Sequence, residues 1–182
     1  MTPELDLVTA PDFLDALPGR EMEELRAMRS RCQSLENSLS YVRRLIQGRL
    51  DIAGAEMQRR RSGGESGDTS ELIGRLPDIL SEGSRIVGGP GSVRPPISME
   101  PDADVTLQLE LMLDAVISPD ELSHATTLPD EALTNAITNL HDLEDKVSEQ
   151  RRGLHTVIDQ VQAEVTRRYR TGEANVDGLL SS

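Results

Sequence analysis

Two long stretches of the chain carry apolar residues at helical spacings, and in the first stretch these residues lie alternately three and four apart, which is typical of a coiled-coil helix. In the first stretch, residues 20–61, these residues are Leu25, Met28, Cys32, Leu35, Leu39, Val42 and Ile46. In the second, residues 128–171, they are Leu133, Ile137, Leu140, Val147, Leu154, Ile158, Val161 and Val165. Each helix would be roughly 60 Å long at about 1.5 Å per residue. Neither helix can bury its stripe alone, so the pattern predicts that the two pack together.

The sequence around these helices predicts shorter elements and linkers. Residues 62–70 and 83–101 are rich in Gly, Ser and Pro, as flexible connections are. Residues 70–81 could form a short helix interrupted by Pro77, and residues 102–117 are amphipathic. The tetrapeptide 118–121 (SPDE) has the residues of a helix start. We therefore expect an all-α fold, with two long helices in an antiparallel coiled coil. Short helices would lie in a flexible connector, residues 62–127, and residues 1–19 and 172–182 would form terminal segments.

Composition excludes several classes of protein. Of 182 residues, 36% are hydrophobic and only Phe13, Tyr41 and Tyr169 are aromatic, too few for the usual core of an α/β enzyme. A net charge of -13 argues against sequence-independent binding to DNA or to anionic membranes. No apolar run approaches the ~18 residues of a membrane span, and the N-terminus lacks the features of a signal peptide. The single cysteine, Cys32, fits a reducing compartment, so we expect a cytoplasmic protein.

The two long helices contain an internal repeat. When Glu36 is aligned with Glu144, both helices carry the frame E-x3-S-x2-R-x3-[QH]-x3-D without a gap. These spacings place the five residues of each copy on one stripe that borders the apolar seam. Further identities are Arg44/Arg152 within the frame and Ala55/Ala163, Glu56/Glu164, Arg59/Arg167 and Arg60/Arg168 beyond it. The first copy of the frame is Glu36, Ser40, Arg43, Gln47 and Asp51, and the second is Glu144, Ser148, Arg151, His155 and Asp159.

The residue types of this stripe suit a guanine nucleotide. Arginine can donate two hydrogen bonds to O6 and N7 of guanine, and a carboxylate can accept from the N1–H and N2–H edge. Arginine also pairs with phosphate. The alternative is a solvated polar flank, in which Glu36 with Ser40 and Arg43 with Gln47 are helix-surface pairs. Two copies in the same phase favour the binding interpretation.

The doubled frame on two long helices resembles the RsiG family of actinobacterial anti-sigma factors. The resemblance covers both long helices. It implies that the two helices contact an intercalated dimer of cyclic di-GMP, two nucleotides per chain, and that the sporulation sigma factor WhiG then packs over the ligand and is sequestered. All ten frame residues would be ligand-binding residues, although His155 replaces the glutamine of the family motif. The chain itself would be monomeric, without direct contact to DNA or membrane.

Other functions have weaker support in the sequence. No nucleophile motif, phosphate-binding loop or metal-ligand spacing is present, so we expect neither an enzyme nor a metal site. Residues 121–143 have the rhythm of a helix-turn-helix, but Asp130 and Glu131 would repel phosphates. A structural coiled-coil adaptor without a nucleotide is the other alternative. The arginines near the helix ends, at 59–61, 167, 168 and 170, are expected to be mainly solvated charge favoured by the helix dipole. The alternative is that they attract an anionic ligand.

Overall fold

The computed structural model describes residues 2–15, 17–63 and 100–173. Within these ranges the chain forms helices and no strands, which confirms the predicted all-α class. The long helices are α2 (Met22–Arg61) and α6 (Asp130–Thr171). The shorter elements are α1 (Pro3–Val8), η1 (Pro11–Leu14), η2 (Leu17–Gly19), α4 (Ala103–Asp114), α5 (Pro119–Ser123) and η3 (Ala125–Thr127). The short helix predicted within residues 70–81 lies outside the described residues.

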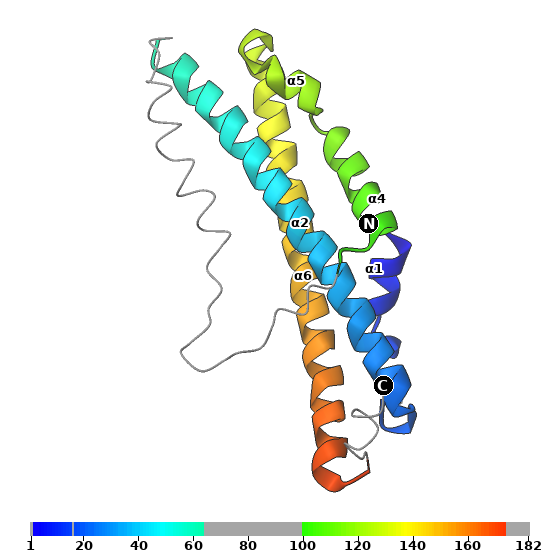
Figure 1. Ribbon diagram of the computed structural model, residues 1–182. Helices are drawn as coiled ribbons and strands as arrows, with labels where there is room; N and C mark the ends of the chain where they lie inside the picture. Colours follow the sequence, from blue (N-terminus) through cyan, green and yellow to red (C-terminus); the bar gives the residue numbers. More distant parts are fainter. Residues whose placement is uncertain (1, 16, 64–99, 174–182) are drawn as a thin grey trace.

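The helices α2 and α6 run antiparallel along most of the molecule's length (Figure 1). Their facing sides are the predicted apolar seams, and residues such as Leu39, Ile46, Val147 and Leu154 are at most 1% exposed. Burying a leucine or valine side chain contributes roughly 1.5–3 kcal/mol, so this seam supplies the main stabilisation of the fold. Cys32 is fully buried in it, and burial raises the pKa of its thiol to about 11.

The shorter helices cover one side of the α2–α6 pair. Figure 1 shows α4 and α1 one below the other on the same side of the two long helices. Ser38, fully buried on α2, accepts a hydrogen bond from the Asp102 backbone N–H at 2.8 Å. Asp102 in turn caps α4 by accepting from the Val105 backbone N–H and binds Arg31 of α2 at 2.5 Å. The first turn of α4 is thereby fixed to α2.

The starts of the helices follow local capping chemistry. Ser118 and Glu121 form a capping box with Pro119 in the first turn of α5, as the SPDE tetrapeptide predicts. Pro129 is the N-cap of α6, one residue before the helix begins. The structure also contradicts the helix-turn-helix interpretation of residues 121–143. That segment holds the end of the five-residue α5, the η3 turn and the start of a 42-residue helix, rather than two comparable helices.

The internal repeat extends over almost the whole described fold. In the alignment that pairs Glu36 with Glu144, η1 corresponds to α5, η2 to η3, and α2 to α6, each pair beginning at equivalent positions. The residues that precede the long helices are also related, since LDLVTAPDFL at 5–14 aligns with LDAVISPDEL at 113–122. The chain therefore consists of two similar units related by an approximate twofold axis. The sequence analysis recognised only the part of this repeat that lies in the long helices.

Candidate functional site

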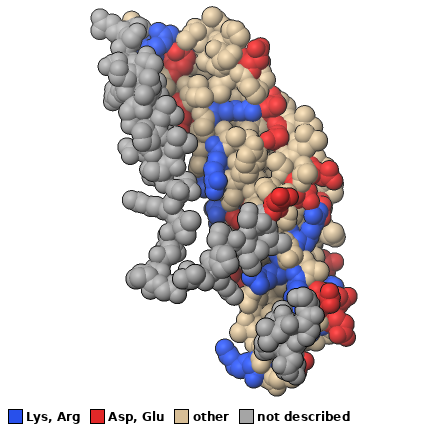
Figure 2. All heavy atoms as spheres, viewed as in Figure 1, with Lys and Arg blue, Asp and Glu red and all other residues tan. Residues whose placement is uncertain are grey.

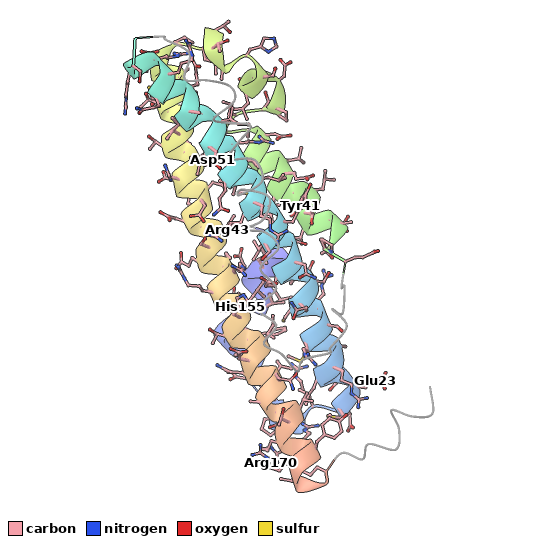
Figure 3. All side chains as sticks on the ribbon, turned by 60° about the vertical axis from the view of Figure 1, so that its left-hand side comes forward. Glu23, Tyr41, Arg43, Asp51, His155 and Arg170 are labelled. Carbon is pink, nitrogen blue, oxygen red and sulfur yellow. The ribbon has the colours of Figure 1, made fainter. Side chains whose placement is uncertain are left out.

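The repeated stripes lie on the side of the α2–α6 pair that α1 and α4 leave uncovered. Figure 3 shows Arg43, Asp51 and His155 along the face where the two long helices lie side by side, with α4 behind α2. On both helices the stripe borders the seam, as the spacing predicts. We call this surface the motif face; it comprises Glu36, Ser40, Arg43, Gln47, Asp51, Glu144, Ser148, Arg151, His155 and Asp159.

Each motif copy is completed by the arginine of the other copy. Arg43 Nε donates to Glu144 Oε1 at 2.6 Å and to Ser148 Oγ at 3.0 Å across the helix pair. Ser148 Oγ also donates to Glu144 Oε1 at 2.9 Å. The motif face thus holds a Glu–Ser–Arg cluster in which the carboxylate and the hydroxyl come from α6 and the guanidinium comes from α2.

The second cluster is the twofold counterpart of the first. Arg151 Nε donates to Glu36 Oε1 at 2.7 Å, and Ser40 Oγ donates to the same oxygen at 2.8 Å. His155 Nε2 lies 3.4 Å from this oxygen, and half of the His155 side chain is exposed. His155 is therefore a polar neighbour of the Glu36 cluster.

Burial and charge pairing together fix the ionisation of the two glutamates. Glu36 is only 6% exposed although it belongs to a polar stripe. Burial by itself favours the neutral acid, but the hydrogen bonds from Arg151 and Ser40 outweigh it and hold the pKa of Glu36 below its ordinary value. The same causes, with Arg43 and Ser148 as partners, lower the pKa of Glu144. Both glutamates are charged at neutral pH.

The two arginines keep donors available for a ligand. Among the described residues, Arg43 and Arg151 make their hydrogen bonds through Nε, and neither Nη atom donates to the protein. About a third of each side chain is exposed. The guanidinium planes are therefore oriented by the glutamates while their outer nitrogens remain accessible. Gln47, Asp51 and Asp159 lie on the same face outside the two clusters, with both aspartates exposed.

The sequence analysis misjudged two arginines near the helix ends. It treated Arg60 and Arg168 as solvated charge, but both are largely covered by the segment that precedes the opposite long helix. Arg60 Nη2 donates to the carbonyl of Ala125 at 2.7 Å, and Arg168 Nη2 donates to the carbonyl of Leu17 at 2.9 Å. Ala125 and Leu17 are themselves equivalent positions of the repeat. The identity of Arg60 and Arg168 in the repeat was only a weak signal, because the exposed arginines Arg44 and Arg152 recur in the same register.

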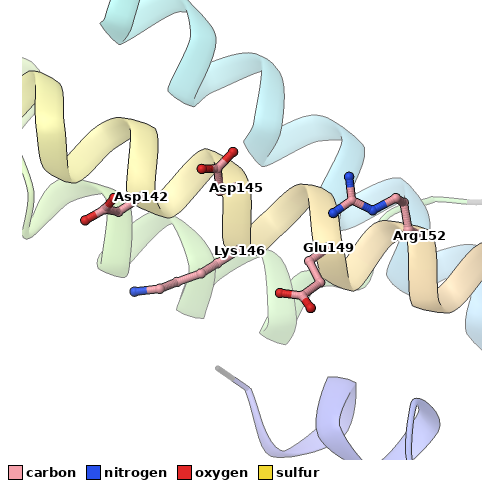
Figure 4. Close-up of a pocket in the computed structure, with 5 residues that line it drawn as sticks. All are labelled: Asp142, Asp145, Lys146, Glu149 and Arg152. Atoms are coloured by element: carbon pink, nitrogen blue, oxygen red, sulfur yellow. The ribbon is translucent and has the colours of Figure 1, made fainter.

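A shallow hollow of about 440 Å³ lies on α6, away from the motif face. Figure 4 shows that its walls are five charged side chains of one helix, Asp142, Asp145, Lys146, Glu149 and Arg152. Three of these positions correspond in the repeat to Ser34, Ser38 and Tyr41 of α2, which contact α4 or the residues that lead into it. The hollow is therefore the uncovered counterpart of the α4 contact. Among the described residues no group of His, Cys, Asp and Glu is arranged to hold a metal ion.

The fold defines a class of protein, an all-helical protein built on an intramolecular pair of long antiparallel helices. The sequence model of the RsiG-like family matches residues 11–80 and 119–182, together more than half of the chain, and the chain belongs to this family. Membership indicates a regulatory anti-sigma factor with a sigma factor as its partner. No curated protein matches the chain. Within the described parts, no helix has an apolar stretch long enough to cross a membrane.

Proposed function

We propose that this protein is an anti-sigma factor that binds cyclic di-GMP on the motif face and, with the nucleotide bound, sequesters a WhiG-type sigma factor. The observation that carries the proposal is the pair of Glu–Ser–Arg clusters, each built from both helices and each presenting outward guanidinium nitrogens. Its expected setting is the cytoplasm, with repression of a sporulation programme as the result.

The chemistry of the clusters matches a guanine nucleotide. The free Nη atoms of Arg43 and Arg151 suit O6 and N7 of guanine or a phosphate oxygen. The exposed carboxylates Asp51 and Asp159 suit the N1–H and N2–H edge of the base. Because Nε of each arginine is already held by a glutamate, less conformational freedom is lost when the ligand binds.

The symmetry of the motif face also supports this ligand. Cyclic di-GMP consists of two identical halves, with two guanines and two phosphates. An approximate twofold axis relates the two clusters, and a ligand with its own twofold symmetry meets equivalent groups on both helices. We propose two nucleotides per chain, with one motif copy on each side of the pair.

Isothermal titration of the full chain with cyclic di-GMP, with and without the sigma factor, tests the proposal. We expect saturation at two nucleotides per complex and binding of the sigma factor that depends on the nucleotide. Cyclic di-AMP is the matched control, because adenine presents an amino group where guanine presents O6. Equal binding of both nucleotides, or saturation at one nucleotide per complex, would contradict the proposal.

A structural coiled-coil adaptor remains the second candidate, and one observation favours it. The motif side chains already satisfy one another across the helix pair, so the clusters can stabilise the fold without a ligand. In that case variants of Arg43 and Arg151 would change stability alone, and titration with cyclic di-GMP would give no heat of binding.

A further inference from the structure

The helix α4 has two apolar faces, and only one of them packs against other described residues of the chain. Its inner face is Val105, Leu109 and Leu113, each at most 2% exposed. Its outer face carries Leu107, Leu111 and Met112, which are 56%, 60% and 37% exposed. A single exposed leucine is ordinary, but two exposed leucines one turn apart, followed by a partly exposed methionine, make an apolar surface that a partner can cover. We call Leu107, Leu111 and Met112 the outer stripe.

The surroundings of the outer stripe are acidic. Asp104 and Glu110 lie on the same helix, and the chain contains no Lys or Arg between residues 95 and 145. The two basic side chains that α2 contributes nearby are neutralised, since Arg31 binds Asp102 and Arg49 binds Asp114. Figure 2 shows carboxylates along the side of the molecule where α4 lies. An occupant of this surface must therefore combine apolar side chains with positive charge.

The acidic charge around the outer stripe determines which kind of partner can bind there. A second copy of this chain would bring the same acidic face, so like charges would oppose its approach. A sigma factor is a DNA-binding protein, and such proteins present Lys and Arg to neutralise phosphates. We propose that the outer stripe of α4 docks a basic amphipathic helix from the DNA-contacting surface of the sigma factor. This inference rests on the proposed anti-sigma function.

The position of α4 makes this contact separate from the motif face. The helix lies on the opposite flank of α2, and it falls between the two segments that match the RsiG-like family, residues 11–80 and 119–182. The corresponding flank of α6 carries the charged hollow and the six-residue helix α1, which matches only the end of α4 in the repeat. The contact would therefore let this chain hold its sigma factor on two sides and cover a surface that the sigma factor needs for DNA.

A photo-crosslinker at position 108 identifies the occupant directly. Gln108 is exposed beside Leu107 and Leu111, so the probe points from the outer stripe without removing it. In the full chain with the sigma factor and cyclic di-GMP, we expect a crosslink to a Lys- and Arg-rich sigma-factor peptide. A crosslink to another copy of this chain or to its own residues 64–99 would overturn the proposal.

The double variant Leu107→Ser/Leu111→Ser measures the contribution of the stripe. Both side chains are more than half exposed in the free protein, so we expect unchanged helicity and melting temperature. We expect a loss of sigma-factor affinity of about 10- to 100-fold, from two leucines that lose their burial in the complex. The matched control is Leu7→Ser, because Leu7 is 64% exposed on α1.

The outcome separates this inference from the proposed function. If the parent chain and the double variant bind the sigma factor equally in the presence of cyclic di-GMP, the docking proposal is wrong and the proposed function stands. If the parent chain itself does not bind the sigma factor with the nucleotide, the proposed function fails, and the docking proposal fails with it.

Discussion

At the scale of single residues, the motif is a unit formed by two helices rather than a list of positions on one. The sequence predicts that Glu36 and Arg43 share a stripe beside the seam, and the structure confirms this placement. The partners of these residues could not be predicted, because pairing across helices depends on the register between them. Heptad spacing fixes which face is buried but leaves the register undetermined by whole turns. The structure sets the register that places Arg43 beside Glu144.

Arg43→Ala and Arg151→Ala should each weaken nucleotide-dependent binding of the sigma factor. An arginine that binds a guanine edge in bidentate fashion contributes roughly 1–3 kcal/mol, which corresponds to a loss of about 5- to 150-fold. Titration with cyclic di-GMP in the presence of the sigma factor measures this loss. The controls are Arg44→Ala and Arg152→Ala, which remove arginines one position further along each helix. Equal behaviour of all four variants would argue for the adaptor function.

The same substitutions should also lower stability, and by unequal amounts. Arg151→Ala leaves the Glu36 carboxylate, whose side chain is 9% exposed, without its guanidinium. Arg43→Ala does the same to Glu144, whose side chain is 18% exposed. Because the arginines are about one-third exposed, solvent screening limits the expected cost to about 1 kcal/mol, larger for Arg151→Ala. Urea denaturation measures the difference, and a larger loss for Arg43→Ala would contradict this reasoning.

The lowered carboxylate pKa values predict how stability depends on pH. Arg59 and Arg60 lower the pKa of Glu56 to about 2, and Arg167 and Arg168 lower that of Glu164 to about 2, from an ordinary value of 4.5. A pKa lowered by folding stabilises the native state above the unfolded value, and that stabilisation is lost as pH falls through the folded value. The contribution of Glu56 and Glu164 to the urea midpoint should therefore be constant above pH 4.5 and should decline as the pH falls from 4.5 to 2. A urea midpoint that rises as the pH falls through this range would contradict the prediction.

At the scale of elements, the ends of the long helices are joined to the segments that precede their partners. Arg60 of α2 holds η3 before α6, and Arg168 of α6 holds η2 before α2. No element was predicted in residues 1–19, since apolar periodicity cannot resolve helices of a few residues. Extending the repeat towards the N-terminus would have related that segment to residues 109–127, where the SPDE start is recognisable.

Arg60→Ala and Arg168→Ala should loosen these junctions, because each substitution leaves at least one backbone carbonyl without its charged donor. We expect the larger loss for Arg168, which is 8% exposed and binds the carbonyls of both Leu17 and Pro18. A hydrogen bond to a charged group contributes about 1.5–3 kcal/mol, and a loss of this size is expected for Arg168→Ala. Thermal melts and hydrogen exchange in residues 17–19 measure the effect.

The neighbouring arginines provide a matched control for this prediction. Arg59 and Arg167 bind the same glutamates, Glu56 and Glu164, through hydrogen bonds that involve no backbone carbonyl. Arg59→Ala and Arg167→Ala should therefore leave the exchange of η2 and η3 unchanged. If these variants loosen the junctions as much as Arg60→Ala and Arg168→Ala, the carbonyl contacts are not what holds them.

At the scale of the whole molecule, the helix pair and the motif face could be predicted from the sequence, but the layer behind them could not. The seam and the repeat are periodic, so both can be read from spacing alone. The packing of α4 on α2 depends on Ser38 and Asp102, two polar residues far apart in the sequence whose contact no local pattern encodes. For the same reason, the sequence alone could not distinguish the exposed outer stripe of α4 from the buried face of the same helix.

The approximate twofold symmetry leads to a prediction about assembly. Both apolar seams are buried against each other within one chain, and both Glu–Ser–Arg clusters are complete within it. Because α2 and α6 belong to one chain, their pairing has a high effective concentration, on the order of millimolar, with which a second chain at micromolar concentration cannot compete. We therefore expect a monomer of 20.0 kDa in sedimentation equilibrium from low micromolar concentration upwards, with the mass increasing by no more than the bound nucleotide when cyclic di-GMP is added. The double variant Leu107→Ser/Leu111→Ser should sediment identically, since we propose that the outer stripe binds a basic partner and not a second copy of this chain.

A stable homodimer of the parent chain would contradict this prediction. It would indicate that the two seams pair between chains, so that each cluster takes its arginine from a second molecule.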